Sequence, residues 1–212
     1  KYNLKIIEDC AQAHLAKLDG QYVGTMSDIG IFSLNVNKTI QVGEGGICVT
    51  HDEELCYRLQ LIRNHGEAVV GPANYDNIEN IMGFNYRLTE IQAAMAVSQL
   101  DQLEALTSKR LKLVNALSAG LADFPFIKVY QPPSEIKPTY YQYKFTIPAL
   151  EKGDGNRLRQ TLNAEGCYFF SGYSPLYKQP VYAQKKMYKN IFKIDLRAIS
   201  MKISLIYFIK TN

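Results

Sequence analysis

The sequence lacks the features that would exclude a soluble globular protein. Its 212 residues contain no apolar stretch of the roughly 18 to 20 residues that a membrane-spanning helix needs. No dense run of Lys and Arg occurs before the C-terminal end, and the net charge is only +4, so nothing predicts nucleic-acid binding. We expect no signal peptide, because Lys1 leads directly into an apolar run. These absences predict a cytoplasmic protein without membrane or nucleic-acid partners.

The sequence also lacks a cysteine framework. No two cysteines form a CxxC pair, and the three histidines show no metal-ligand spacing with them, so we expect no metal site. Scattered free thiols are typical of a reducing cytoplasm. The four cysteines are Cys10, Cys48, Cys56 and Cys167.

Short apolar runs and turn residues predict an α/β protein. Residues 4–7, 29–34 and 46–50 have the composition of strands, and the last of these is rich in β-branched side chains. Residues 11–18 are compatible with a helix, which a turn at Asp19-Gly20 would end.

Two helices are predicted in the middle of the chain. Thr50 and Glu53 fit a capping box, and the helix that follows would end near residues 64–66. The longest helical signal covers residues 88–121, and we interpret its apolar stripe as core packing. The stripe consists of Ile91, Ala94, Met95, Leu103, Leu106, Leu113, Leu117 and Leu121.

A strand over residues 140–147 and a helix over residues 156–165 predict a second, smaller α/β unit. We therefore expect a first domain over residues 1–115 and a small C-terminal domain over residues 116–212. From about residue 187 the chain becomes atypical, with no Gly or Pro and only one acidic residue. That tail would be either a buried strand or an abnormal end.

Several polar residues follow predicted strands or precede a helix. Asp9 ends a strand, where it would be either a site residue or a turn and cap residue. Ser33 and Lys38 bracket another strand end, and a lone lysine is most often simply solvated. A buried lysine, however, forms a Schiff base with an aldehyde, which is how pyridoxal phosphate is attached to proteins. That cofactor needs a carboxylate for its ring nitrogen and hydroxyls for its phosphate, and these residue types are present.

Four motifs make the interpretation specific. IEDCAQAH, VGTMSDIGIFSLNVNKTIQVGEGGICVT, LIRNHG and GFNYRLTEIQAAM occur in this order over about residues 4 to 100. Together they resemble the DegT/DnrJ/EryC1/StrS family of sugar aminotransferases, which are fold-type-I pyridoxal-phosphate enzymes. The resemblance implies the C-terminal half of the family's large α/β/α domain followed by its smaller α/β domain. It also implies an N-terminally truncated chain, because the family's segment before the first motif is absent.

The resemblance implies a role for each matching residue. Lys38 would be the Schiff-base lysine and then the base that moves protons between cofactor and substrate. Asp9 would pair with the pyridinium nitrogen, and Gln12 would lie near the cofactor ring or its O3′. Ser33 would bind the phosphate, and Asn85 would reach the phosphate of a neighbouring subunit, which implies a homodimer with shared active sites.

Five further residues are candidate substrate contacts. His14 would line the pocket or would be a packing histidine, and His65 and Arg87 would contact substrate or the other subunit. Tyr173 and Tyr177 would face the sugar nucleotide.

The implied activity is transfer of an amino group from glutamate or glutamine to a keto-sugar, in most cases nucleotide-linked, for amino-sugar, polysaccharide or secondary-metabolite biosynthesis. A cyclitol ketone is an alternative acceptor. A related sugar dehydratase is disfavoured, since those relatives typically replace the lysine by histidine and this chain has Lys38. A different class is a catalytically incompetent fragment or interaction protein. One departure from the family is Leu15, where the family usually has Gly.

Overall fold

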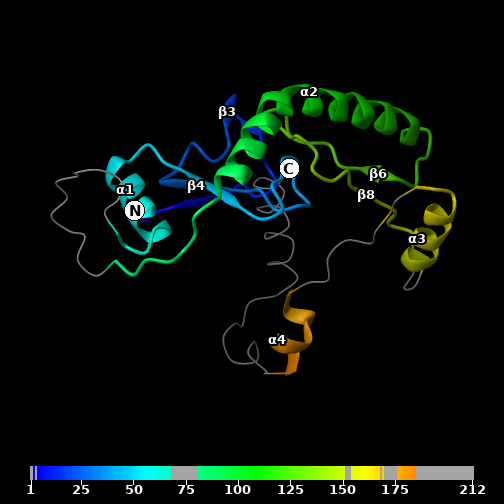
Figure 1. The fold of residues 1–212 in the computed structure, drawn as a ribbon. Helices are drawn as coiled ribbons and strands as arrows, with labels where there is room; N and C mark the ends of the chain where they lie inside the picture. The colour runs from blue at the N-terminus through cyan, green and yellow to red at the C-terminus, as the bar shows by residue number, and fades with distance from the viewer. Residues whose placement is uncertain are drawn as a thin grey trace. The chain divides into compact units, whose positions relative to one another are not determined.

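The computed structural model describes residues 2, 4–67, 81–150, 154–167, 169 and 176–184 (Figure 1). Among these residues no helix is long and apolar enough to cross a membrane. The chain divides into two compact units, which are described separately. The first comprises Lys1–Ser118 and Gln131–Tyr143, and the second comprises Ala119–Tyr130 and the described residues that follow Tyr143.

The first unit contains two three-stranded sheets. The first sheet has the order β1-β4-β5 and the second the order β3-β2-β7. Most of α2 also belongs to this unit, and α1 lies wholly within it. Its elements are β1 (Ile7–Asp9), β2 (Lys17–Leu18), β3 (Gln21–Tyr22), β4 (Ile29–Ser33), β5 (Gly46–Val49), α1 (Glu53–Arg63), α2 (Glu90–Leu121) and β7 (Ile136–Lys137).

In the first sheet β1 and β4 are parallel, and β5 pairs with β4 in the antiparallel direction. Asp9 lies beside Ile31, so the carboxyl ends of β1 and β4 lie at the same edge of the sheet. The predicted strand at residues 29–34 is confirmed almost in full. The predicted strand at residues 4–7 is displaced toward the C-terminus, because Ile7 is its only residue inside β1.

Buried Glu8 joins β1 to the segment that leads into β4. Its carboxylate accepts hydrogen bonds from the backbone N–H groups of Gly24 (2.6 Å) and Met26 (2.9 Å) and from the Ser27 hydroxyl (2.9 Å). Burial by itself would raise the pKa of Glu8, but these hydrogen bonds outweigh it and hold the pKa below its ordinary value. The side chain is therefore a charged structural anchor at neutral pH.

The predicted helix over residues 11–18 is wrong. Leu15 has a φ of +63°, which an α-helix does not contain, and β2 instead pairs with both β3 and β7. The turn at Asp19-Gly20 is confirmed as a two-residue hairpin loop with φ values of +49° and +80°. Positive φ at both loop residues matches the right-handed twist of the flanking strands. Tertiary pairing has therefore overridden the local helical pattern.

Helix α1 begins two residues later than predicted, because its N-cap is Asp52 and not Thr50. The Asp52 Oδ1 accepts a hydrogen bond from the Leu55 N–H at 3.0 Å, so the predicted capping box on Thr50 is wrong. The Thr50 hydroxyl instead donates to the Asp28 carbonyl at 2.6 Å and accepts from the Asp52 N–H at 3.1 Å. The predicted end is confirmed, because the helix is capped at Asn64.

Helix α2 confirms the predicted long helix, but the interpretation of its apolar stripe as core packing is mostly wrong. Leu103 is only 2% exposed, whereas Ile91 is 76% and Leu113 is 71% exposed. The buried residues are Leu103, Thr107 and Val114, so the buried face shares only Leu103 with the predicted stripe. The remaining exposed members of the stripe are Ala94, Met95, Leu106 and Leu117.

The second unit contains β6 (Lys128–Val129) paired antiparallel with β8 (Phe145–Thr146), and α3 (Asp154–Ala164). The predicted helix over residues 156–165 corresponds to α3, and the predicted strand over residues 140–147 is confirmed only at β8. A 3-10 turn (Leu176–Lys178) and α4 (Pro180–Gln184) follow. The atypical tail from about residue 187 lies outside the described residues.

Candidate functional site

The candidate site lies at the edge of the first sheet where β1 and β4 end. Asp9 is the last residue of β1 and Ser33 is the last residue of β4. The Cys10 N–H donates to the Ile31 carbonyl at 2.9 Å, which extends the pairing of the two strands to this edge. Crevices at the carboxyl ends of parallel strands are the usual ligand sites of α/β proteins. The structure therefore places the predicted carboxylate and hydroxyl at the expected kind of edge.

Lys38 lies in a loop, residues 34–45, that connects β4 to β5. Backbone hydrogen bonds cross this loop from Leu34 N–H to the Gly45 carbonyl (2.9 Å) and from Val36 N–H to the Gly43 carbonyl (2.7 Å). The Lys38 N–H donates to the Asn35 carbonyl at 2.9 Å, which closes a tight turn around the lysine. Hydrogen bonds therefore restrain the backbone on both sides of Lys38.

Asn35 fixes the same turn through its side chain. Its Oδ1 accepts from the Asn37 N–H at 3.0 Å and its Nδ2 donates to Glu44 Oε1 at 2.7 Å. The Ser33 hydroxyl oxygen accepts from the Asn35 N–H at 3.3 Å. These contacts link the strand end, the lysine turn and the glycine-rich segment into one hydrogen-bonded structure.

Two glutamines of α2, which the sequence analysis did not single out, dock the loop against the helix. Gln92 Nε2 donates to the carbonyls of Val42 (3.3 Å) and Glu44 (3.0 Å). Gln99 accepts from the Gln41 N–H at 3.0 Å and donates to the Gln41 carbonyl. Their seven-residue spacing places both amides on one face of the helix, and that spacing is the only sequence signal for this role.

His14 is buried close to the lysine loop. The side chain is 5% exposed, and its ring lies 5.5 Å from the Phe32 ring, centroid to centroid. Neither ring nitrogen makes a hydrogen bond among the described residues. Burial is the main cause that lowers the pKa of His14. The Ser33 backbone raises this pKa, whereas the positive charges of Lys38 and Arg110 lower it further. The imidazole is therefore neutral at pH 7, with two unpaired polar atoms.

Gln12 and Asp9 lie on the turn that follows β1. Asp9 is exposed, and its Oδ1 accepts a hydrogen bond from the Ala11 N–H at 3.1 Å. Gln12 is half-buried. The turn brings both residues to the sheet edge of Ser33, with His14 two residues farther along the chain.

Leu15 adopts the left-handed conformation, with a φ of +63°. Its half-buried side chain packs against the cluster of Leu34, Ile40, Val42 and Leu103. A residue with a Cβ in this conformation costs about 1–2 kcal/mol relative to the right-handed region, whereas glycine adopts it freely. Leu15 therefore combines a strained backbone with a favourable packing contact beneath the lysine loop.

We expect Leu15→Gly to be less destabilising than Leu15→Ala. Alanine removes the packing contact and keeps the strain, so the free energy of unfolding should fall by about 2 kcal/mol. Glycine removes the contact but relieves the strain, so the fall should be only about 1 kcal/mol. Urea unfolding of both variants measures the difference.

The matched control is Leu100, which is exposed within α2. There Leu100→Gly should be less stable than Leu100→Ala by about 1 kcal/mol, which is the normal helical order. An alanine variant of Leu15 more stable than the glycine variant would show that the backbone at Leu15 is not strained.

Three other predicted residues, His65, Asn85 and Arg87, belong to segments 62–65 and 84–87, on either side of an undescribed stretch. Residues 62–65 form backbone hydrogen bonds with residues 84–86, with an isolated bridge between Asn64 and Asn85. Arg87 donates to the side-chain oxygen of buried Asn64 at 3.0 Å, and His65 has a φ of +60°. No described contact joins His65, Asn85 or Arg87 to Lys38. Tyr173 and the side chain of Tyr177 lie outside the described residues.

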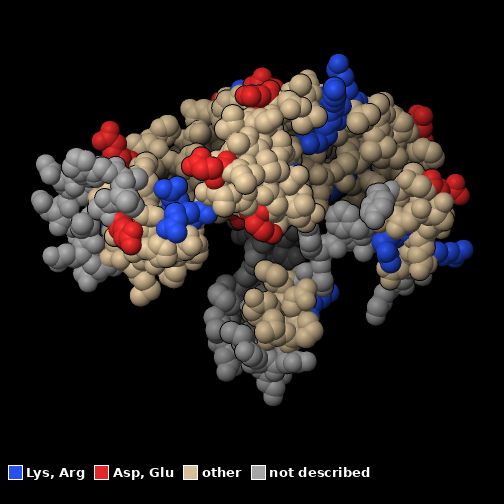
Figure 2. All heavy atoms as spheres, in the orientation of Figure 1, with Lys and Arg blue, Asp and Glu red and all other residues tan. Residues whose placement is uncertain are grey.

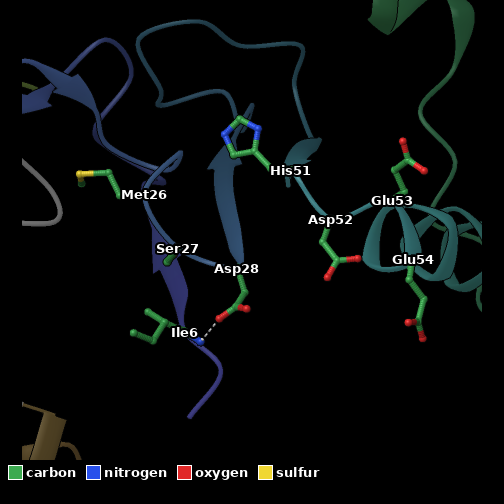
Figure 3. A pocket seen from close by; sticks show the side chains of 8 residues that line it. All are labelled: Ile6, Met26, Ser27, Asp28, His51, Asp52, Glu53 and Glu54. Atoms are coloured by element: carbon green, nitrogen blue, oxygen red, sulfur yellow. Dashed lines mark hydrogen bonds between the residues drawn. The ribbon is translucent and has the colours of Figure 1, made fainter. Parts of the chain in front are cut away.

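A shallow hollow of about 750 Å³ occurs at the opposite edge of the first sheet (Figure 3). It is lined by residues that precede β1 and β4, including Ile6 and Asp28, whose carboxylate accepts the Ile6 N–H at 2.8 Å. Acidic side chains at the start of α1 complete it, but the described residues hold no cluster with metal-ligand geometry. Its position at the amino ends of the strands separates it from the lysine loop.

Charged side chains are spread over the face drawn in Figure 2. Lys and Arg occur there in a few small separate groups, with Asp and Glu in others, among the described residues. That face therefore lacks the electrostatic footprint by which a basic protein attracts a polyanion.

Comparison with known proteins identifies similar sequences and folds. A family model, the DegT/DnrJ/EryC1/StrS aminotransferase family, matches residues 1–208. GDP-perosamine synthase of Escherichia coli O157:H7 is 32% identical over 185 residues, covering 86% of this chain and 48% of that protein. L-glutamine:2-deoxy-scyllo-inosose aminotransferase of Streptomyces kanamyceticus is 32% identical over 191 residues, covering 86% and 45%. This chain thus spans about half the length of the curated relatives it matches.

Solved structures of aminotransferases are similar to this chain in fold. A DegT DnrJ EryC1 StrS aminotransferase from Brucella abortus has a TM-score of 0.70 at 31% identity, covering 85% of this chain and 46% of that chain. DesV of S. venezuelae, solved in complex with a ketimine intermediate, has a TM-score of 0.74 at 30% identity, covering 87% and 47%. These similarities confirm the fold class predicted from the sequence motifs.

Proposed function

Because the chain belongs to the DegT/DnrJ/EryC1/StrS aminotransferase family, we propose that it is a pyridoxal-phosphate-dependent sugar aminotransferase. The observation that carries the proposal is the placement of Lys38 in a braced loop directly after β4, at the edge where Asp9 ends β1 and Ser33 ends β4. An amine, a carboxylate and a hydroxyl at one strand edge are the three groups that the cofactor requires.

The chemistry of these residues fits the cofactor. Lys38 would hold it covalently, and Asp9 would keep a proton on its ring nitrogen, because an opposite charge nearby favours the protonated ring. Ser33 would bind the phosphate and Gln12 would contact the ring or its O3′. The unpaired nitrogens of His14 fit a site that receives a polar ligand. When bound, pyridoxal phosphate supplies an electrophilic carbonyl carbon and a ring that withdraws electrons from the reacting centre.

The contribution of this chain is to position these groups and to move protons. Lys38, once its amine is free, would take the proton from one carbon and return it to another as general base and acid. Asn35, Gln92 and Gln99 hold the backbone of its loop, so the amine starts from a restricted set of positions.

The amino acceptor is a keto-sugar, in most cases nucleotide-linked, or a cyclitol ketone, and the donor is glutamate or glutamine. The names of the relatives support this choice, because one of them acts on 2-deoxy-scyllo-inosose with L-glutamine and another is a GDP-perosamine synthase. The presence of a lysine at position 38 disfavours the related dehydratase reaction, because those relatives typically have histidine there. We also propose substrate or subunit contacts for five residues: His14, His65, Arg87, Tyr173 and Tyr177.

We also propose a cytoplasmic homodimer in which Asn85 serves the cofactor of the neighbouring subunit. Asn85 is exposed, so its side chain is accessible to a neighbouring subunit, as such a role requires. The domains would be residues 1–115, which carry the cofactor site, and residues 116–212.

A second candidate is a catalytically incompetent member of the family. Two observations favour it: the carboxylate side chain of Asp9 is exposed, and α2 leaves Ile91 and Leu113 largely uncovered.

The donor half of the reaction distinguishes the two candidates without knowledge of the sugar. We expect the protein incubated with pyridoxal phosphate and L-glutamate to release 2-oxoglutarate in proportion to the protein, as the cofactor takes up the amino group. The visible absorbance of the bound cofactor should disappear in the same proportion, and L-glutamine should release the corresponding 2-oxo amide. A protein that binds the cofactor but releases no 2-oxo acid from either donor would support the incompetent candidate.

A further inference from the structure

Tyr141 contacts the lysine loop at two adjacent points. Its hydroxyl donates a hydrogen bond to the Asn37 carbonyl at 2.7 Å. The Lys38 Nζ lies 5.3 Å from the centroid of the Tyr141 ring. The two partners are about a hundred residues apart in the sequence, so the contact is a product of the tertiary structure. No motif of the sequence analysis includes this tyrosine.

Each contact restrains a different part of Lys38. The Asn37 carbonyl belongs to the peptide group that joins Asn37 to Lys38, so the hydroxyl holds the backbone plane that carries the lysine. The aromatic face is negative, so an ammonium within about 6 Å of the ring centroid is attracted to it. One side chain therefore restrains both the peptide and the amine of the same residue.

The segment that carries Tyr141 is itself anchored on both sides. Before it, Ile136 of β7 is buried and pairs with Leu18 of β2. Closer to it, the carbonyl of buried Thr139 accepts a hydrogen bond from Arg110 Nη1 at 3.2 Å. A rigid support of this kind distinguishes a built contact from a chance encounter of two exposed side chains.

After Tyr141, the chain is anchored again. The hydroxyls of Tyr143 and Ser118 of α2 lie 2.9 Å apart and share a hydrogen bond. Because anchors occur within two residues on each side, the Tyr141 ring has little freedom to leave the lysine loop.

A second lysine–tyrosine pair provides a comparison. Lys17 Nζ lies 4.2 Å from the Tyr22 ring centroid, but these residues are direct cross-strand partners of β2 and β3. Strand register alone brings them together. Nothing in the register brings Lys38 to Tyr141.

We propose that Tyr141 is a positioning residue for Lys38, which seats the amine over its ring and fixes the Asn37–Lys38 peptide through its hydroxyl. The inference rests on the proposed function, in which Lys38 bonds covalently to pyridoxal phosphate. Tyr141 has no part in the chemical step. It limits the positions from which the amine reaches the carbonyl carbon of the cofactor.

The first test uses the protein without cofactor. Limited acetylation with acetic anhydride, followed by peptide mass spectrometry, gives the labelling rate of Lys38 relative to Lys17. We expect Tyr141→Leu to raise this ratio about three- to tenfold, because the ring no longer attracts and covers the Lys38 side chain. Tyr141→Phe keeps the ring and should change the ratio less than about twofold. Tyr22→Leu is the matched control, and it should raise only the labelling of Lys17.

The second test measures the rate of covalent attachment of pyridoxal phosphate to Lys38. Here both Tyr141 variants should be slower than the wild type, the phenylalanine variant by about threefold and the leucine variant by about tenfold, the size of effect expected when one and then two modest contacts are lost. In the leucine variant, Lys38 would thus react faster with acetic anhydride but attach pyridoxal phosphate more slowly. General loosening of the fold would raise the labelling of Lys17 together with that of Lys38, so the labelling ratio separates it from loss of the Tyr141 contact.

Two results would overturn the proposal: an unchanged ratio of Lys38 to Lys17 acetylation in Tyr141→Leu, or an equal rise in the acetylation of both lysines. If Tyr141→Leu does not fold, the phenylalanine variant decides, and attachment at the wild-type rate would overturn it. Failure of the proposed function appears separately, as a wild-type protein that attaches no cofactor, while the acetylation ratio still reports on the Tyr141 contact.

Discussion

Lys38→Ala is expected to abolish covalent attachment of pyridoxal phosphate and to lower any amino-transfer rate by about 10²–10⁴-fold, the range for loss of a positioned acid–base group. Alanine has no amine to bond to the cofactor and no group to move the proton. Two readouts measure the effect: the visible absorbance band of the bound cofactor, and the mass of the Lys38 peptide after borohydride reduction.

Two variants serve as controls for this experiment. Lys17→Ala removes another lysine that lies over a tyrosine ring, and it should leave the band unchanged. Lys38→Arg keeps the positive charge over Tyr141 but cannot form the covalent bond, because arginine stays protonated. A band that persists in Lys38→Ala would contradict the assignment of this lysine.

Gly30→Ala is expected to cause a large loss of stability, about 3 kcal/mol or more in the free energy of unfolding. A Cβ at Gly30 would lie 2.0 Å from the Gly24 carbonyl oxygen, which is backbone and cannot rotate away. Gly24 is itself held, because its N–H donates to the buried Glu8 carboxylate at 2.6 Å. Gly30 also pairs with Glu8 in the β1–β4 register, so displacement of either strand would disturb the edge that carries Asp9 and Ser33.

Gly120→Ala is the matched control. This glycine lies near the end of α2 with no atom within 4 Å of the added Cβ, so alanine should stabilise the protein by about 0.5–1 kcal/mol. Urea unfolding of the two variants gives both values. A Gly30→Ala protein within about 1 kcal/mol of the wild type would show that the close approach of Gly30 to the Gly24 backbone is not rigid.

Local signals predicted the elements whose conformation depends on near neighbours. The turn at Asp19-Gly20 was predicted from its turn residues, and the long helix α2 was predicted from the helical signal over residues 88–121. Strand β4 was predicted to within one residue because its apolar run is flanked by polar residues. The position of Asp9 and Ser33 at strand ends followed from the same runs.

Predictions failed where distant residues decide the outcome. The segment over residues 11–18 has a helical pattern, but pairing with β3 and β7 makes part of it a strand and leaves Leu15 left-handed. The α2 stripe was predicted to be core, but the buried face of α2 shares only Leu103 with it. Thr50 was predicted as a helix cap, but its hydroxyl donates a hydrogen bond to the Asp28 carbonyl instead.

The candidate site divides in the same way. The sequence by itself determined the family motifs, the lysine between a strand and a glycine cluster, and the carboxylate and hydroxyl at neighbouring strand ends. Only the tertiary structure decided that Gln92 and Gln99 brace the lysine loop and that Tyr141 lies against Lys38. The physical reason is that these contacts join residues 48 to 104 positions apart. Such contacts depend on how whole elements pack, and no periodicity or turn signal within a short window encodes that packing.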